Sequence, residues 1–281
     1  MYYLKILILA IVQGLAELLP VSSSAHVIMA EKAMGLDPSS PDMTLLLVLL
    51  HTGTMFAVIL YYWRSWQLAY FSSWAAFKET AIYIVVATAI TGVVGLSLQW
   101  FIKHFYAGGD PNFEIEQLFG NLQLVATGLA AAGLVIIGAS AIPDLMGKLS
   151  IGRAAMIGAV QGLCLPFRGF SRSGATISTG LMTGVSRQTA EEFSFALAVV
   201  LTPPIIAKEV LRLLGHKVAE AGAGPVHLTG MILPGLLGML LSFAAGLFAL
   251  RWLSSWLGSN KWHFFGYYCL AAAIACFWMS L

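Results

Sequence analysis

The sequence has little charge and few cysteines. Charged residues make up 10% of the 281 residues, with 15 Lys and Arg against 13 Asp and Glu, and they form no basic run or tail. Such a chain lacks the positive patch of a nucleic-acid-binding protein, so we expect no nucleic acid partner. Cys164, Cys269 and Cys276 lie in apolar stretches without metal-ligand spacing, which predicts buried free thiols.

Apolar residues take the place of the missing charge. They account for 59% of the chain, and the mean hydropathy is +0.83. Soluble globular domains are much more polar than this. The composition predicts an all-α polytopic membrane protein with a single integral membrane domain over residues 1–281.

Six apolar stretches are long enough to cross about 30 Å of hydrocarbon at about 1.5 Å per helical residue. They are residues 43–63, 81–102, 118–142, 190–212, 226–250 and 262–281. We expect each of them to be a transmembrane helix.

Two further apolar regions are interrupted by polar turns. Residues 3–19 and 22–34 lie on either side of Pro20, and residues 151–164 and 174–186 lie on either side of the segment Pro166-Phe167-Arg168-Gly169. Arms of about 20 Å are too short to cross a bilayer as helices. We expect two re-entrant helical hairpins, and each turn should line a cavity because irregular backbone survives at that depth only there or inside protein.

The two turns carry related polar sequences. Gln13-Gly14-Leu15, Pro20 and Ser22-Ser23-Ser24-Ala25-His26 recur as Gln161-Gly162-Leu163, Pro166 and Ser171-Arg172-Ser173-Gly174-Ala175-Thr176. Ionisable groups at membrane depth are costly and mark functional sites. Broken helices of inverted-repeat transporters meet near the midplane, so we expect the two turns to face each other.

Lys and Arg near the spans predict the orientation. Three loops are assigned to the cytoplasm by Arg64 and Lys78, by Lys148 and Arg153, and by Arg251 and Lys261. The segment with Lys103, Asp110, Glu114 and Glu116 is then external. This arrangement gives an inverted-topology repeat, in which residues 1–147 and residues 148–281 each form one re-entrant hairpin and three transmembrane helices. The alternative is eight ordinary spans with a chance similarity between the halves.

The first turn is expected to bring together an acid, a hydroxyl and an imidazole. Gln13 and Glu17 lie four residues apart on one helix face. One serine of the run 22–24 should cap the return helix, whose first amides would form an anion site. His26 lies one helical turn further on.

The second turn supplies cations and hydroxyls. Arg172 offers a planar charged fork that suits phosphate oxygens. The other candidate phosphate-binding residues are Ser22, Ser24, Ser171, Ser173, Thr176 and Arg168. Each residue also has a structural interpretation as a cap, a helix-helix hydrogen bond or a silent ion pair. The run His51-Thr52-Gly53-Thr54 is assigned to close helix packing, with contact to the site as the alternative.

At these motifs the chain resembles the undecaprenyl-diphosphate phosphatases of the bacitracin-resistance type, over essentially its whole length. The first family motif has Glu or Gln, three residues, Glu, then Leu-Pro-Val-Ser-Ser and a His, and it matches residues 13–26. The second, Pro-Gly-x-Ser-Arg-Ser-Gly-x-Thr, matches residues 168–176. Gln13 stands where many members have Glu, Ser24-Ala25 replaces the common Thr-Gly, and Arg168 stands at the usual Pro position.

The resemblance implies hydrolysis of undecaprenyl diphosphate to undecaprenyl phosphate and inorganic phosphate at the outer face of the bacterial inner membrane. This reaction recycles the carrier lipid for peptidoglycan synthesis, and bacitracin resistance follows because that antibiotic sequesters the substrate. The resemblance also implies a divalent cation, Mg²⁺ or Ca²⁺, held partly by Glu17. Gln13 is a poorer ligand because it is an amide.

Phosphoryl transfer needs charge neutralised on the phosphate oxygens and an in-line nucleophile. We expect Ser23 to be the nucleophile, Glu17 or His26 to be the general base, and Arg172 to neutralise charge. Water or His26 is the alternative nucleophile. The alternative function is a transporter or flippase of a polyprenyl phosphate lipid, since inverted repeats are transporter architecture.

Overall fold

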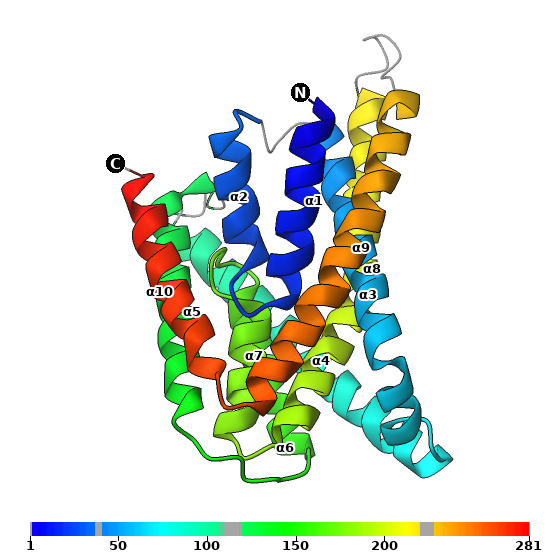
Figure 1. The fold of residues 1–281 in the computed structure, drawn as a ribbon, viewed down its shortest axis with the longest axis vertical. Helices are drawn as coiled ribbons and strands as arrows, with labels where there is room; N and C mark the ends of the chain where they lie inside the picture. Colours follow the sequence, from blue (N-terminus) through cyan, green and yellow to red (C-terminus); the bar gives the residue numbers. More distant parts are fainter. Residues whose placement is uncertain are drawn as a thin grey trace.

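The computed structural model describes residues 2–36, 41–106, 120–219 and 228–280, together with residues 108 and 118. Over these ranges the chain is helical, with one isolated β-bridge between Gly147 and Val185. The helices stand roughly side by side, and the two chain ends lie at the same end of the molecule (Figure 1). The predicted all-helical class is confirmed.

The helices begin and end close to the polar breaks in the sequence. In chain order they are α1 Tyr2–Leu18, α2 Ser23–Ala33, α3 Pro41–Ala69, α4 Trp74–Phe101, the π-helical η1 Ile102–Tyr106, α5 Leu122–Ser140, α6 Ile151–Cys164, α7 Arg172–Met182, α8 Arg187–Ala219, α9 Leu228–Gly258 and α10 Trp262–Trp278. Short polar side chains cap several starts: Ser73 accepts from Ala76 N, and Asn121 accepts from the amides of Gln123 and Leu124.

Four of the described helices contain segments long and apolar enough to cross a membrane. They are Leu45–Ala69, Trp74–Tyr106, Leu122–Ser140 and Leu233–Gly258. The predicted stretch 262–281 corresponds to the apolar α10, which has 17 residues, and the stretch 190–212 lies within α8, which contains Pro203 and Pro204. The chain is therefore a multi-pass membrane protein. The acids Asp110, Glu114 and Glu116, which were predicted to be external, fall outside the described residues.

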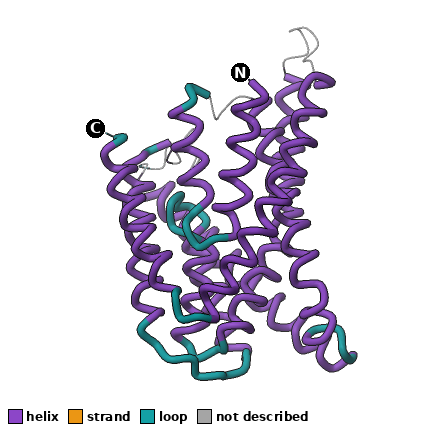
Figure 2. The backbone as a smooth tube through the Cα atoms, in the orientation of Figure 1, coloured by secondary structure: helices purple, strands orange, loops and turns teal. Residues whose placement is uncertain are grey.

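The two predicted interrupted regions form helical hairpins. The breaks at Pro20 and Pro166 are confirmed, because α1 ends at Leu18 and α6 ends at Cys164. Figure 2 draws loops in teal, and the turns that follow α1 and α6 lie in the middle of the molecule and not at its ends. The polar turns thus lie between the two ends of the molecule, and Ser22 and Ser171 within them are buried.

Three sets of helix contacts hold the turns in place. Helix α9 packs against α1 and α3, α10 packs against α5, and α4 packs against α6. The main buried cluster joins Leu18 of α1, Phe195 of α8, Leu253 of α9 and Trp262 of α10. Because this cluster includes the last residue of α1, the first turn begins directly from the core.

Candidate active site

Glu17, near the end of α1, is the centre of a polar cluster. Ser23 Oγ, at the start of α2, donates to Glu17 Oε2 at 2.5 Å, and Gln13 Nε2 donates to the same oxygen at 3.1 Å. Arg172 Nη2, at the start of α7, lies 3.3 Å from Glu17 Oε1. One carboxylate therefore joins both turns, and the prediction that the turns face each other is confirmed.

Backbone contacts bring the turns together as well. Ser173 Oγ donates to Leu19 O at 3.3 Å. A Cβ atom added to Gly174 would lie 3.2 Å from Pro20 O, and Cys269 Sγ of α10 lies 3.3 Å from the same oxygen. Small residues of the second turn thus allow its backbone to pack closely against the first turn.

All three cysteines are free and buried, as predicted.

The first turn leaves its helix start uncapped. Ser22 is the N-cap residue of α2, but it has φ 67°, and its side chain makes no capping hydrogen bond. The left-handed region costs a non-glycine residue roughly 1–2 kcal/mol. The prediction that a serine caps α2 is wrong, because Ser22 Oγ pairs with Ser24 Oγ at 3.2 Å and Ser23 turns back to Glu17. The first amides of α2 are left for an anion.

Hydroxyl groups of the second turn make hydrogen bonds within the turn and to its neighbours. Ser171 Oγ accepts from Gly174 N at 3.2 Å and caps α7. Thr176 is fully buried; its Oγ1 donates to Arg172 O at 2.8 Å and lies 2.6 Å from Ser194 Oγ. These hydroxyls hold the turn in place, and the phosphate-binding role predicted for Ser171, Ser173 and Thr176 stays a prediction.

The two arginines of the second turn face different carboxylates. Arg172 Nη2 faces Glu17, whereas its Nη1 atom is buried and has no hydrogen-bond partner among the described residues. A buried donor without an acceptor is costly, and a phosphate oxygen would satisfy it. Arg168 interacts electrostatically with Glu31 of α2, a side chain that is 1% exposed. The predicted phosphate-binding role of Arg168 stays a prediction.

His26 makes different contacts from those expected. Its Nδ1 atom lies 2.9 Å from Ser22 O, and its Nε2 atom lies 2.7 Å from Tyr268 OH of α10. A carbonyl oxygen only accepts, so the Nδ1 atom carries the proton and the lone pair of Nε2 accepts from the phenol. The imidazole is thus directed toward Ser22 and Tyr268, whereas the acid and the hydroxyl pair with each other.

Two site residues follow less directly from the sequence. The sequence around Tyr268 shows only a phenol inside an apolar helix, and nothing in it indicated a site residue. His51 of α3 places Nε2 at 3.6 Å from Glu17 Oε2. The packing interpretation is confirmed at Gly53, where an added Cβ atom would collide with Met239 O of α9. The hydroxyls of Thr52 and Thr54 donate to carbonyl oxygens of α3 itself. For His51 the alternative interpretation, contact with the site, is correct.

Comparison with known proteins identifies the family. Residues 6–275 match the family described as Bacitracin resistance protein BacA. The chain belongs to the BacA family. Undecaprenyl-diphosphatase 2 of Acinetobacter baylyi is 61% identical over 269 residues, which cover 95% of this chain and 94% of the relative.

More distant relatives also align with this chain over nearly its whole length. The undecaprenyl-diphosphatases of Korarchaeum cryptofilum and Desulfitobacterium hafniense are 30% and 32% identical. Their alignments cover 96% and 94% of this chain, and 96% and 91% of the relatives. The similarity therefore includes both turns of the BacA fold.

The site of this BacA protein fits a divalent cation only together with a bound ligand. Within the described ranges, no three His, Cys, Asp or Glu side chains are grouped to hold a metal ion. Mg²⁺ is commonly bound by one or two carboxylates with waters and substrate phosphates. Glu17 supplies one carboxylate, and Gln13 directs its amide nitrogen toward Glu17, which leaves its carbonyl oxygen as the weaker ligand.

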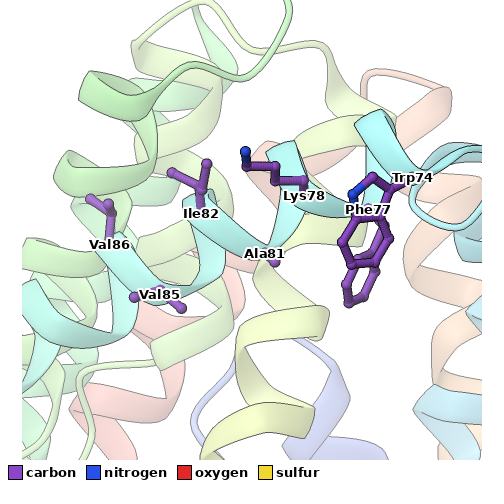
Figure 3. A pocket seen from close by; sticks show the side chains of 7 residues that line it. All are labelled: Trp74, Phe77, Lys78, Ala81, Ile82, Val85 and Val86. Atoms are coloured by element: carbon purple, nitrogen blue, oxygen red, sulfur yellow. The ribbon is translucent and has the colours of Figure 1, made fainter.

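A separate pocket on α4 does not suit the chemistry of the BacA site. It has a volume of about 280 Å³ and is lined by Trp74, Phe77, Lys78, Ala81, Ile82, Val85 and Val86 (Figure 3). A single ammonium group among apolar side chains supplies no acid, base or nucleophile pair. The Glu17 cluster is therefore the candidate active site.

Proposed function

We propose that this chain hydrolyses undecaprenyl diphosphate to undecaprenyl phosphate and inorganic phosphate, and so recycles the carrier lipid of peptidoglycan synthesis. The observation that carries the proposal is the meeting of Ser23, Glu17 and Arg172, a hydroxyl, a carboxylate and a guanidinium joined by contacts of 2.5 and 3.3 Å. The BacA family and the names of the relatives support the same substrate. Removal of the lipid diphosphate that bacitracin sequesters would give resistance.

In the proposed reaction Ser23 Oγ attacks the terminal phosphorus in line with the bridging oxygen. The Ser23 proton passes to Glu17 Oε2 as the new bond forms, and the bond from phosphorus to the bridging oxygen breaks to release undecaprenyl phosphate. Water then hydrolyses the phosphoserine. The 2.5 Å contact supports Glu17 as the base, because both nitrogens of His26 are directed elsewhere.

The remaining groups neutralise charge on the phosphates. Arg172 Nη1 and the first amides of α2 are the donors available to phosphate oxygens. His26 would assist the departing oxygen only as an imidazolium, which donates from Nε2 once that atom exchanges Tyr268 for the substrate. Bound Mg²⁺ or Ca²⁺ would supply further positive charge, and Glu17 would hold it, with Gln13 as the weaker ligand.

We further propose that both hairpins are re-entrant and that residues 1–147 and 148–281 are an inverted repeat in the bacterial inner membrane. The interior position of both turns supports this topology (Figure 2), and so does the contact between them through Glu17. With the basic loops in the cytoplasm, the first hairpin opens to the periplasm, and the site opens to that side.

The direct test mixes purified protein in detergent with a polyprenyl diphosphate and Mg²⁺ and measures inorganic phosphate. We expect multiple turnovers, which chelation of the cation with EDTA should stop. Wild-type protein that releases no phosphate would contradict the proposal. If the same preparation, reconstituted in vesicles, moved polyprenyl phosphate between leaflets, the flippase would be the better assignment. Substantial activity of Ser23→Ala would favour water or His26 as the nucleophile.

A further inference from the structure

We propose that the hydroxyl of Tyr268 binds the lipid-side phosphate of the substrate, the phosphate that stays on the undecaprenyl chain when the terminal one is removed. The inference rests on the proposed function and adds a contact to the same site. It makes Tyr268 a substrate-binding residue of α10 and not only a packing residue. The ligand class is a polyprenyl phosphate or diphosphate, which the phenol would recognise through a non-bridging oxygen of that phosphate.

The proposed attack directs the lipid-side phosphate away from Ser23. An in-line displacement has the attacking and leaving oxygens on opposite sides of the phosphorus. Ser23 Oγ donates to Glu17 at 2.5 Å, and Arg172 lies 3.3 Å from the same carboxylate. These three side chains are the proposed surroundings of the terminal phosphate. The bridging oxygen and the lipid-side phosphate then point away from them.

The imidazole of His26 is directed away from that cluster and toward α10. Its Nδ1 atom lies 2.9 Å from Ser22 O, so the ring folds back toward the start of α2, as helical side chains tend to do. Its Nε2 atom lies 2.7 Å from Tyr268 OH, and the two rings are 13° from parallel. The proposed partner of Nε2 is the departing oxygen, which stays on the lipid-side phosphate. A phenol within hydrogen-bond distance of Nε2 is therefore beside that phosphate.

A phenol hydroxyl can change its acceptor while its ring stays in place. The hydroxyl hydrogen rotates about the C–O bond and donates one hydrogen bond. Without substrate, its acceptor is the neutral nitrogen Nε2 of His26. A phosphate oxygen is ionised, and hydrogen bonds to ionised acceptors are about twice as strong as neutral ones. Bound substrate would therefore take the hydrogen bond of Tyr268 and release Nε2 for the departing oxygen.

Helix α10 is attached to both hairpins, which fixes the position of Tyr268. The next residue, Cys269, places Sγ at 3.3 Å from Pro20 O in the first turn. At the start of α10, Trp262 Nε1 donates to Ser178 Oγ of α7 at 3.1 Å. The phenol can thus keep its place when the imidazole releases it.

The exposure of Tyr268 suits contact with a ligand. Its side chain is 48% exposed, and its hydrogen bond to His26 is exposed as well. The preceding residue, Tyr267, is 55% exposed, but its ring packs against His263 of the same helix. Tyr267 therefore offers a matched phenol, from the same helix and with similar exposure, that has a different ring partner.

The test uses the full-length protein in detergent and measures equilibrium binding of tritiated undecaprenyl phosphate. Tyr268→Phe keeps the aromatic ring and removes only the hydroxyl. Its Kd for this lipid should rise about tenfold, as when a hydrogen bond to a charged group is lost. In steady-state kinetics with a polyprenyl diphosphate and Mg²⁺, KM should rise by the same factor. The value of kcat should stay within about twofold, because the bond is made in the ground state and in the transition state.

Inorganic phosphate provides the first control, because it lacks the lipid-side phosphate. Its inhibition constant should be the same for Tyr268→Phe and for the wild type, which also shows that the variant is folded. Tyr267→Phe is the second control and should match the wild type in Kd, KM and kcat.

Two results would overturn the inference. A lower kcat of Tyr268→Phe with unchanged affinity for undecaprenyl phosphate would show that the phenol only positions His26. Equal binding of the lipid by Tyr268→Phe and the wild type, or binding by neither, would show that the hydroxyl does not contact it. If the wild type released no phosphate, the proposed function would fail, while the lipid-binding measurement would still decide the contact of Tyr268.

Discussion

The two turns have related sequences but opposite local structures. In the first turn the N-cap residue Ser22 adopts a left-handed backbone, its side chain makes no cap, and Ser23 donates to the carboxylate Glu17. In the second turn Ser171 caps α7, and Thr176 bonds to a backbone carbonyl and to Ser194. The first turn therefore leaves the start of its helix uncapped, while the second caps its own helix and leaves Arg172 Nη1 without a partner among the described residues.

This difference suggests separate roles for the two turns: the proposed chemistry belongs to the first turn, and the second turn supports it. Strained backbone and unpaired amides raise the energy of the folded chain and persist only where the surroundings impose them. Here the imposing surroundings are the second turn, which contacts Leu19 O through Ser173 and approaches Pro20 O at Gly174. A regular, capped turn thus packs against an irregular one and holds it in place.

The largest effect on activity should come from removing a serine hydroxyl, and the two turns should respond differently to it. Ser23→Ala should lower phosphate release by about 10⁶-fold, on the order of the loss of a covalent nucleophile, with little change in thermal stability. Ser171→Ala should instead lower the free energy of unfolding by about 1 kcal/mol through loss of the cap. Paired activity and melting measurements in one detergent check this. Equal effects of the two variants would remove the proposed division of roles.

A second test removes the link between the turns. Glu17→Gln keeps the shape of the side chain but loses the negative charge, so phosphate release should fall about 10³-fold, as for a general base. Glu79→Gln is the matched control, because Glu79 is an exposed carboxylate that accepts from Tyr83. Its rate should equal that of the wild type. A rapid Glu17→Gln enzyme would show that another group activates Ser23.

A smaller loss is expected for Arg172→Lys. Lysine keeps the charge near Glu17 but cannot offer the second donor that Arg172 Nη1 provides, so kcat should fall about 100-fold, as when a transition-state donor is removed. Arg187→Lys changes an arginine that bonds Leu257 O and Asn260 instead. Steady-state kinetics should show that kcat of that control stays within about twofold of the wild-type value, since such pairs away from the site contribute little. Equal kcat values in both variants would contradict the assignment.

The smallest effect concerns backbone strain. Ser22→Gly should raise the free energy of unfolding by about 1 kcal/mol, because glycine adopts a positive φ without cost. At Gly169, φ is 93° and a Cβ atom would collide with Val125 O. Gly169→Ala should therefore destabilise the protein. Melting curves of both variants in detergent check the signs, and a lower melting temperature for Ser22→Gly would show that its hydroxyl outweighs the strain.

Much of the helical arrangement was predictable from length and polarity. Pro20 and Pro166 correctly marked the ends of α1 and α6. The repeated polar phrase also predicted that Arg172 would meet the first turn, because costly polar groups at depth need one another. These predictions depend on the lengths of the apolar stretches, which the sequence gives directly, and on the known hydrophobic thickness of a bilayer.

The side-chain partners were less predictable. His26 was expected beside the acid, yet its ring lies against Tyr268, a residue 242 positions away. The choice between Ser22 and Ser23 as a cap depended on a positive φ that no propensity predicts for serine. Contacts between distant helices decide such details, and a single sequence carries little trace of them.

Tyr268 is 48% exposed on α10, on the outer side of the imidazole that it bonds. This phenol therefore connects the imidazole of the candidate site to the exposed surface of α10. If the substrate is an amphiphile with a long isoprenoid tail, as proposed, an approach past this ring would keep its hydrocarbon out of water. Detergent molecules gathered around α10 would compete along the same approach, and turnover should be faster in lipid nanodiscs than in micelles.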